Sequence, residues 1–220
     1  MFNPDMIRLL AQGIWETLYM TIVSSLLAYL LGLPLGILLI VTDKDGICPM
    51  RLLNHILGFI VNFVRSVPFL ILLIAVIPFT RFLVGTSVGS TATIVPLVLA
   101  SAPFVARMVE SSLKEVDRGL VEAARSMGAG PWQVVTKVLL PEAKPSLILN
   151  AAIAATTILG YSAMSGFVGG GGLGTISINY GFYRYQSDVM LVTVLLLVVI
   201  VQVFQVIGLR VATRGDKRSR

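Results

Sequence analysis

The sequence predicts an all-α, polytopic membrane protein whose chain crosses the bilayer five times. Two observations lead to this fold class. Of the 220 residues, 56% are hydrophobic and only 13% are charged, and that charged share is about half of what soluble domains carry. A soluble domain also needs a polar surface, which this composition cannot supply, whereas lipid accepts an apolar exterior. In addition, the charged residues gather in short clusters that separate long apolar stretches.

The apolar stretches define the predicted spans. A helix needs roughly 20 apolar residues to cross about 30 Å of hydrocarbon. Five stretches meet this requirement within one domain that covers residues 1–220, and residues 4–14 before them are predicted to form a short interfacial helix. The predicted spans are 17–41, 57–79, 87–107, 146–167 and 189–209.

The distribution of Lys and Arg predicts the orientation. Fourteen basic residues lie in 42–56, at Arg65, in 107–145 and in 210–220. The opposite side carries only three, namely Arg8, Arg81 and Arg184. Because basic residues favour the cytoplasmic side, we expect the N-terminus outside and the C-terminus in the cytoplasm.

The segment between the third and fourth spans is the only long polar insertion. Residues 107–144 hold eleven of the 28 charges. Within it, the i, i+3, i+4, i+7 spacing of one helix face relates Leu120, Ala123, Ala124 and Met127. The small alanines favour a helix that docks in a groove on a partner. An amphipathic helix on the membrane surface accounts for the spacing equally well.

The flanking residues predict the limits of this short helix. Gly119 comes before it, and Gly128 suits the position just after a helix C-terminus. Pro131 is predicted to open a second helix as its first residue, and Pro141 to end it.

The segment 119–141 resembles the EAA signature of ABC importer permeases. Glu122-Ala123-Ala124 is followed after three residues by Gly128, and after nine more by Val138-Leu139-Leu140-Pro141. The resemblance implies the type I ABC importer permease fold, with a cytoplasmic coupling helix between spans three and four that docks on an ATPase subunit. The coupling residues that it implies are Leu120, Glu122, Ala123, Ala124, Met127 and Gly128.

Other segments are similar to the methionine importer branch of that family. Among them are Arg65-Ser66-Val67-Pro68-Phe69 and Gly160-Tyr161-Ser162-Ala163-Met164. The resemblance implies a permease for D/L-methionine in the cell (plasma or inner) membrane. It further implies a homodimer with the path between the copies, two cytoplasmic ABC ATPase subunits and an external substrate-binding lipoprotein. Membrane lipid and a small amino acid complete the expected partners, and nucleic acid is not among them.

The sequence carries no recognisable catalytic or metal-binding motif. It lacks Gly-x-x-x-x-Gly-Lys-[Ser/Thr], so ATP is expected to be used by a separate subunit, and no cofactor is expected on this chain. Gly169, Gly171 and Gly174 satisfy G-x-G-x-x-G, but they follow a membrane span and not a strand, so a turn or tight helix packing is predicted there. We therefore expect a transport subunit and not an enzyme.

Two features within the spans are candidate parts of a translocation path. Arg65 lies about 12 Å into the second span, where it either snorkels to the headgroups or faces a water-filled path. Ser162 and Met164 lie in the fourth span. The serine can simply return a hydrogen bond to its own backbone, while the flexible methionine is suited to gate a narrow path.

Three other functions remain compatible with the residues alone. A permease for another small amino acid has the same motifs. An ATP-independent channel or carrier explains the spans but not the EAA pattern, and carriers often have intramembrane carboxylates that the predicted spans lack. A membrane scaffold predicts no uptake.

Overall fold

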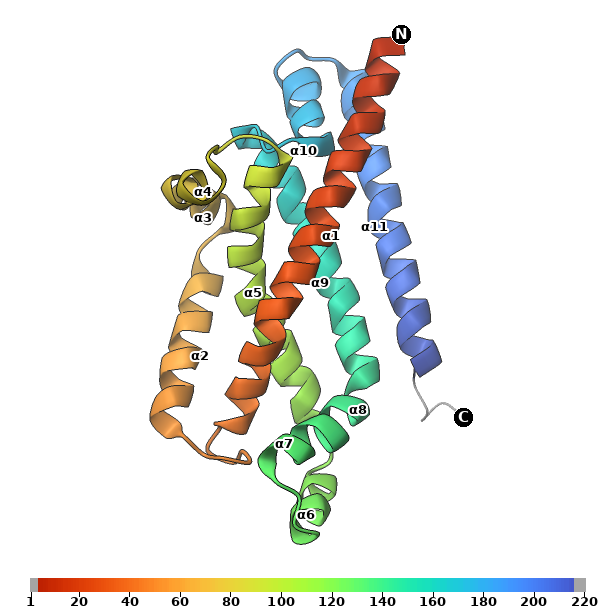
Figure 1. Cartoon of the computed structure of the whole chain (residues 1–220). Coiled ribbons are helices and arrows are strands. Elements are labelled where there is room, and N and C mark those ends of the chain that lie inside the picture. Colours follow the sequence, from red (N-terminus) through yellow and green to blue (C-terminus); the bar gives the residue numbers. More distant parts are fainter. Residues whose placement is uncertain (1–3, 216–220) are drawn as a thin grey trace. The chain divides into compact units, whose positions relative to one another are not determined.

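The structure is a computed structural model that describes residues 4–215, with side chains from 4 to 212 (Figure 1). Within this range the chain forms helices and turns and no strand. The long helices are α1 (Pro4–Val41), α2 (Arg51–Ser66), α5 (Ser90–Lys114), α9 (Lys144–Met164) and α11 (Ser187–Gly215). The short ones are α3 (Phe69–Ala75), α4 (Ile77–Val84), α6 (Arg118–Ser126), α7 (Pro131–Val134), α8 (Leu140–Glu142) and α10 (Gly172–Ile176), with η1 (Val135–Leu139), η2 (Ser165–Val168) and η3 (Ser177–Phe182).

The all-α fold class is confirmed. Among the described residues, four helical stretches are long and apolar enough to cross a membrane, or up to five if a bent pair of helices counts as one span. The four are Pro4–Val41, Ser90–Lys114, Lys144–Phe182 and Ser187–Ala212. They contain the predicted spans 17–41, 146–167 and 189–209 and most of 87–107.

The second predicted span differs from a single straight helix. Residues 57–79 are divided among α2, α3 and the start of α4, and the axes of α2 and α3 meet at 101°. The break falls at Val67 and Pro68. Proline lacks a backbone N–H and disfavours helical geometry in the residue before it, so the hydrogen-bond ladder of α2 ends there.

The start of the chain also differs from the prediction. Residues 4–14 are helical, as predicted, but they do not form a short helix of their own, because α1 runs without a break from Pro4 to Val41. One residue in every turn of this helix is buried along a single side, beginning with Leu10, Gly13 and Thr17. Since the same face stays packed throughout, nothing ends the helix between the two predicted segments.

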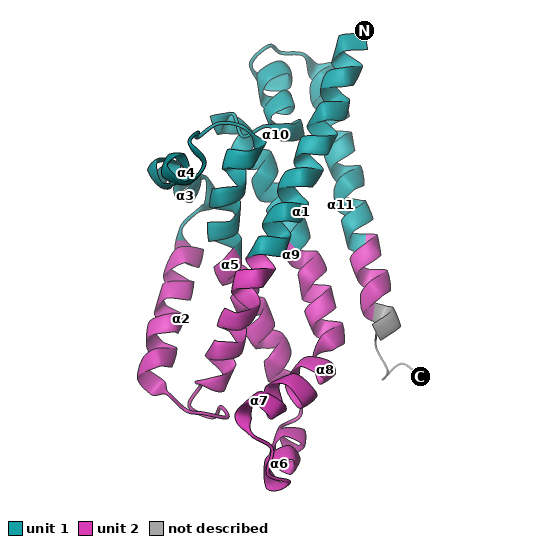
Figure 2. Ribbon diagram, viewed as in Figure 1, with its two compact units in different colours: residues 1–27, 67–101, 155–205 teal, residues 28–66, 102–154, 206–220 magenta. Residues whose placement is uncertain are grey.

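The chain divides into two compact units (Figure 2). Unit 1 comprises residues 1–27, 67–101 and 155–205, and unit 2 comprises 28–66, 102–154 and 206–220. Each of α1, α5, α9 and α11 contributes residues to both units.

In unit 2, α1 packs against α5 with almost no side chain between them. A Cβ placed on Gly36 would lie 2.6 Å from the carbonyl oxygen of Ala106, and one on Gly32 would lie 2.8 Å from that of Ala102. Such close backbones are typical of helix pairs in membranes, where small residues increase the area of contact. Helix α2 covers the same region through Val61, which packs in one apolar cluster with Leu39 and Ala106.

In unit 1, the short helix α10 packs against the first half of α1. Leu173 and Ile176 form an apolar cluster with Leu10 of α1 and Val189 of α11. The backbone at Gly174 also lies so close to Ala163 of α9 that a Cβ would overlap its carbonyl oxygen. The Gly-rich segment therefore serves tight helix packing at Gly174 and also forms a turn before α10, where Gly169 and Gly171 have positive φ, so both predicted alternatives hold.

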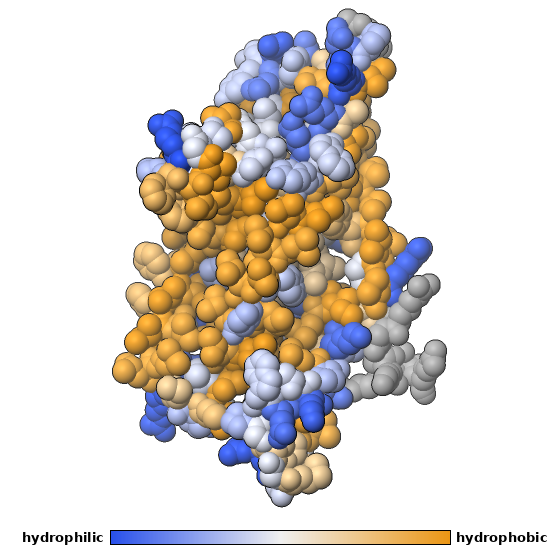
Figure 3. Space-filling view, viewed as in Figure 1, coloured by the Kyte–Doolittle hydropathy of each residue, from blue (hydrophilic) through white to orange (hydrophobic). Residues whose placement is uncertain are grey.

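The surface of unit 2 separates apolar from polar regions. On the face shown in Figure 3, hydrophobic residues cover α2, whereas hydrophilic residues gather around α6 and α7. Leu52, Phe59 and Phe63 of α2 are between 62% and 77% exposed. A cluster of large apolar side chains at that exposure marks a surface that contacts lipid or another protein.

Candidate functional site

Helix α6 is defined by its own end groups. At its start, the Asp117 carboxylate accepts a hydrogen bond from the Gly119 backbone N–H at 2.7 Å. At its end, Gly128 has φ +83°, and its N–H donates to the Arg125 carbonyl at 2.9 Å while the Ala129 N–H donates to the Ala124 carbonyl at 3.1 Å. This pair of bonds is the Schellman arrangement, which requires a left-handed residue. The predicted role of Gly128 is confirmed, and the helix begins one residue before Gly119.

The two sides of α6 have different environments. Ala124 is only 7% exposed and faces the chain, with Val121 half-buried beside it. Leu120 and Met127 are 44% and 83% exposed, and Ala123 is exposed between them. The four residues predicted to share one face therefore lie on two sides of α6. Leu120, Ala123 and Met127 form an outward surface, and Ala124 faces inward.

The segment after α6 provides the support beneath it. Pro131 is the first residue of α7, as predicted, and the side-chain oxygen of Gln133 accepts a hydrogen bond from the Gly130 N–H at 2.9 Å. The chain continues through a π-helical turn, η1, with Val135 and Leu139 buried. Pro141 does not end this segment, because it occupies the first turn of α8, where a missing N–H is tolerated.

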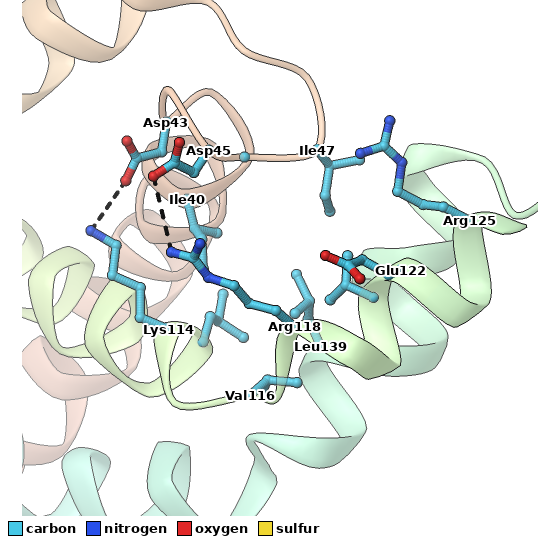
Figure 4. Close-up of a pocket in the computed structure, with 13 residues that line it drawn as sticks. Ile40, Asp43, Asp45, Ile47, Lys114, Val116, Arg118, Glu122, Arg125 and Leu139 are labelled. Atoms are coloured by element: carbon cyan, nitrogen blue, oxygen red, sulfur yellow. Dashed lines mark ion pairs between the residues drawn. The ribbon is translucent and has the colours of Figure 1, made fainter.

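A pocket of about 290 Å³ lies between α6 and the loop that follows α1 (Figure 4). All of its lining residues belong to unit 2. Leu113, Val116 and Leu139 are among its apolar lining. Its charged residues are of both signs: Asp43, Asp45 and Glu122 are acidic, and Lys114, Arg118 and Arg125 are basic.

Two ion pairs cross this pocket. Lys114 Nζ lies 3.3 Å from Asp43 Oδ2, and Arg118 Nη2 lies 4.0 Å from Asp45 Oδ2. In the described part of the chain, Glu122 has no ion pair, and in Figure 4 its carboxylate points into the open space. The outer part of the pocket thus keeps an unpaired charge available to a partner.

Asp43 is held in its ionised form. Burial acts against the charged carboxylate, but hydrogen bonds from the Lys44 backbone N–H and from the Lys114 ammonium outweigh it, together with the attraction of both lysines. These interactions lower the pKa of Asp43 below its usual value. The loop therefore presents a fixed negative charge to the end of α5.

The predicted path residues fall in different units. Arg65 lies exposed at the end of α2 in unit 2, directly before the 101° bend. In unit 1, Ser162 is buried and its hydroxyl donates to the Leu159 carbonyl at 2.8 Å. Met164 ends α9 and is 48% exposed. Thus Ser162 satisfies its own backbone, whereas Arg65 and Met164 present accessible side chains.

Two amides of the Gly-rich turn that could bind a phosphate already have acceptors. The Gly172 N–H donates to Glu16 Oε2 at 2.7 Å, and the Leu173 N–H donates to Thr17 Oγ1 at 2.9 Å. Because side chains of α1 already occupy these donors, the G-x-G-x-x-G match has a structural explanation.

Sequence reasoning missed the ionic contacts around α6. No sequence motif marks the acidic partners. Asp43 and Asp45 pair with cations that are distant in the sequence, and Glu110 pairs with a lysine on the next turn of its own helix. The only signal was the i, i+4 spacing of Glu110 and Lys114, which is common on exposed helices.

A family model decides the class of the chain. Residues 32–220 match the family described as the binding-protein-dependent transport system inner membrane component. The chain belongs to this family. Because the described residues include several helices long and apolar enough to cross a membrane, the chain is a multi-pass protein of the inner membrane.

Curated relatives carry a more detailed description. The chain is 51% identical over 210 residues to a probable D-methionine transport system permease protein MetI of Vibrio cholerae, covering 96% of this chain and 93% of the relative. It is 52% identical over 164 residues to the D-methionine transport system permease protein MetI of Escherichia coli, covering 74% of this chain and 76% of the relative.

Two solved structures have the same fold as this chain. A chain of the inward-facing MetNI methionine ABC transporter, in its native crystal form, matches with a TM-score of 0.97 at 49% identity, over 98% of this chain and 100% of that one. A chain of an amino acid ABC transporter crystallised with histidines matches with a TM-score of 0.78 at 20% identity. The second likeness concerns the fold alone. The predicted type I importer fold and the family resemblance are thereby confirmed.

Proposed function

We propose that this chain is the membrane-spanning permease subunit of an ATP-driven importer of D- and L-methionine. The observation that carries the proposal is α6, a short helix in the EAA segment that is capped at both ends and has an exposed outward face. The relatives named for D-methionine transport, at about half identity across most of the chain, support the choice of substrate.

The proposed assembly contains two copies of this chain, two ATPase subunits and an external substrate-binding lipoprotein. ATP is bound and hydrolysed by the partner subunits, and the solute moves between the two permease copies. In this arrangement Arg65 and Met164 are candidate path residues because their side chains are accessible. Ser162 is the weaker candidate, since it is buried and its hydroxyl already donates to the Leu159 carbonyl.

Reconstitution tests the function. Liposomes that contain this chain with its ATPase subunit and binding protein are expected to take up labelled methionine only with ATP, and unlabelled D-methionine is expected to compete. The matched control contains this chain alone and should take up none. Uptake by the chain alone would show a channel or carrier, uptake of another amino acid in place of methionine would correct the substrate, and no uptake of any solute would favour a scaffold.

The proposed function also implies an orientation of the chain in the membrane, which labelling of a cysteine can test. We propose that the N-terminus lies outside and that the loop after α1 and α6 lie in the cytoplasm. The single cysteine, Cys48, is a partly accessible free thiol in that loop. A membrane-impermeant maleimide is expected to label it in inside-out vesicles and not in intact cells. Cys48→Ser combined with Thr86→Cys should show the reverse pattern, because Thr86 lies in the exposed turn after α4.

The outward face of α6 is the proposed ATPase contact, formed by Leu120, Glu122, Ala123 and Met127 and completed by the Gly128 cap. Ala123→Trp places a large ring on this face, so it should reduce ATP-driven uptake at least tenfold while the thermal midpoint stays the same. Ala124→Trp is the matched variant, and it should lower the thermal midpoint because Ala124 is buried in its own chain. Normal uptake by Ala123→Trp at normal membrane levels would contradict the docking face.

A further inference from the structure

Glu110 lies near the end of α5 as a nearly buried carboxylate with two cationic partners. It is 7% exposed. Its Oε2 accepts a hydrogen bond from Arg107 Nη1 at 2.5 Å, and its Oε1 accepts one from Lys114 Nζ at 2.7 Å. A buried charge is strongly unfavourable when it lacks a partner, so both neighbours are needed to keep Glu110 in place.

The two cations connect Glu110 to other helices. Arg107 Nη2 donates to Asn62 Oδ1 at 3.0 Å and to the Gly58 carbonyl at 3.3 Å, and both acceptors belong to α2. Lys114 lies 3.3 Å from Asp43 in the loop after α1. One carboxylate therefore links α2, α5 and the end of α1 within unit 2. We call this set of five side chains, Asp43, Asn62, Arg107, Glu110 and Lys114, the ionic network.

The loop in the network is itself fixed. The Gly46 N–H donates to the Asp43 carbonyl at 2.9 Å, and the Cys48 N–H donates to the Val41 carbonyl at 3.0 Å. Because these bonds hold the loop closed on the end of α1, a force applied to Asp43 reaches the helix without being absorbed by a flexible chain.

Helix α6 follows the network after only three residues. Lys114 ends α5, and Asp117 caps α6. Between them, Val116 is 7% exposed and packs in the wall of the pocket (Figure 4). Because this connection is only three residues long and is anchored at Val116, a displacement of α6 would reach α5. The network then determines whether α2 and the end of α1 move with it.

We propose that Glu110 is a positioning residue for energy coupling, which joins the ends of α1, α2 and α5 into one block that moves with α6. This proposal rests on the proposed function. A network that only stabilised the folded chain would affect the amount of assembled complex. A network that transmits movement affects the number of solute molecules imported for each ATP hydrolysed.

The ratio of methionine uptake to ATP hydrolysis in the reconstituted complex separates the two roles. Glu110→Gln keeps the size of the side chain and removes its charge. We expect the ratio to fall at least fivefold while ATP hydrolysis and ATPase co-purification stay within twofold of wild type. Glu115→Gln is the matched control, because Glu115 is an exposed carboxylate without an ion pair among the described residues. Its ratio should be unchanged.

A second pair of variants keeps the proposal testable if Glu110→Gln does not assemble. Asp43→Asn breaks only the outer link, since Glu110 retains both partners, and should lower the ratio at least twofold. Asp43→Glu restores the charge and should restore the ratio.

Specific outcomes overturn the proposal. An unchanged ratio in Glu110→Gln, or in Asp43→Asn where the first variant fails to assemble, would exclude the network from coupling. A loss of uptake that merely follows the loss of assembled complex would assign Glu110 a structural role. Absence of ATP-driven methionine uptake by the wild-type complex would instead contradict the proposed function, so the two failures are distinguishable.

Discussion

The junction of α9 and α10 in unit 1 and the junction of α5 and α6 in unit 2 use opposite means to hold a short helix. At the first, Gly166 and Gly174 bring two backbones together so closely that no Cβ fits between them. At the second, two ion pairs connect the helices to the loop after α1: Lys114 at the end of α5 pairs with Asp43, and Arg118 at the start of α6 pairs with Asp45. Backbone packing tolerates no change in size, whereas ion pairs tolerate changes in distance but not in charge. The second junction is thus suited to move without losing its contacts.

The largest effect is expected where backbones touch. Gly174→Ala should lower stability by about 1–3 kcal/mol, because the added Cβ overlaps the Ala163 carbonyl oxygen and α10 has to shift. The control is Gly160→Ala on α9, which has open space around its position and should be neutral or slightly stabilising. Thermal midpoints in gentle detergent give both values. Equal midpoints would contradict the close packing at Gly174.

A smaller loss is expected from the cap on α10. Glu16→Ala leaves the Gly172 N–H without its acceptor, which by analogy with helix N-caps costs about 0.5–2 kcal/mol. Glu16→Gln keeps an acceptor oxygen and should lose less than half as much. The same thermal measurement compares the two variants. If Glu16→Gln lost nearly as much stability as Glu16→Ala, the charge of Glu16 would matter more than its hydrogen bond.

The cap of α6 is expected to act locally. Gly128→Ala forces a side chain into the left-handed region at a cost of about 1–2 kcal/mol. Hydrogen exchange of the α6 amides should therefore become roughly tenfold faster while exchange in α5 is unchanged. Gly128→Asn is expected to be milder, because asparagine tolerates this conformation. Uniformly faster exchange in both helices would show that α6 does not open independently.

The smallest effect is expected at the exposed ion pair. Asp45→Asn removes the partner of Arg118, but the two groups are 4.0 Å apart and their side chains are 56% and 83% exposed. Exposed pairs of this kind contribute less than about 0.5 kcal/mol because water and salt screen them. Thermal midpoint and uptake should both match wild type. If Asp45→Asn reduced coupling as strongly as Asp43→Asn, the two ion pairs would have to be treated as one unit.

Local patterns predicted well wherever the deciding interaction lies within a few residues. The spacing of Leu120, Ala123 and Met127 predicted a helix, and Gly128 predicted its end, because a helix and its cap are formed by neighbours in sequence. The same patterns failed at Ala124. Its periodic position matches that of Ala123, and only the packing of η1 beneath α6 turns it inward.

The second predicted span shows the other kind of error. Apolar composition over 57–79 indicates burial in lipid but does not give the direction of the helix axis. From the sequence, Pro68 predicts only a weakened backbone hydrogen-bond ladder, and not a bend. Within unit 1, the placement of α3 depends on what it packs against, including the stacking of Phe69 on Tyr161 at 4.5 Å between ring centroids.

The sequence by itself determined the membrane class, the helical content and the coupling segment, because hydropathy, charge clustering and the EAA motif are written in consecutive residues. Only the tertiary structure decided which face of α6 is outward, which glycines bring backbones together, and that Asp43, Asn62, Arg107, Glu110 and Lys114 meet. These contacts join residues up to 71 positions apart (Asp43 and Lys114). Partners at such separation are selected by the packing of whole helices, which no local pattern encodes.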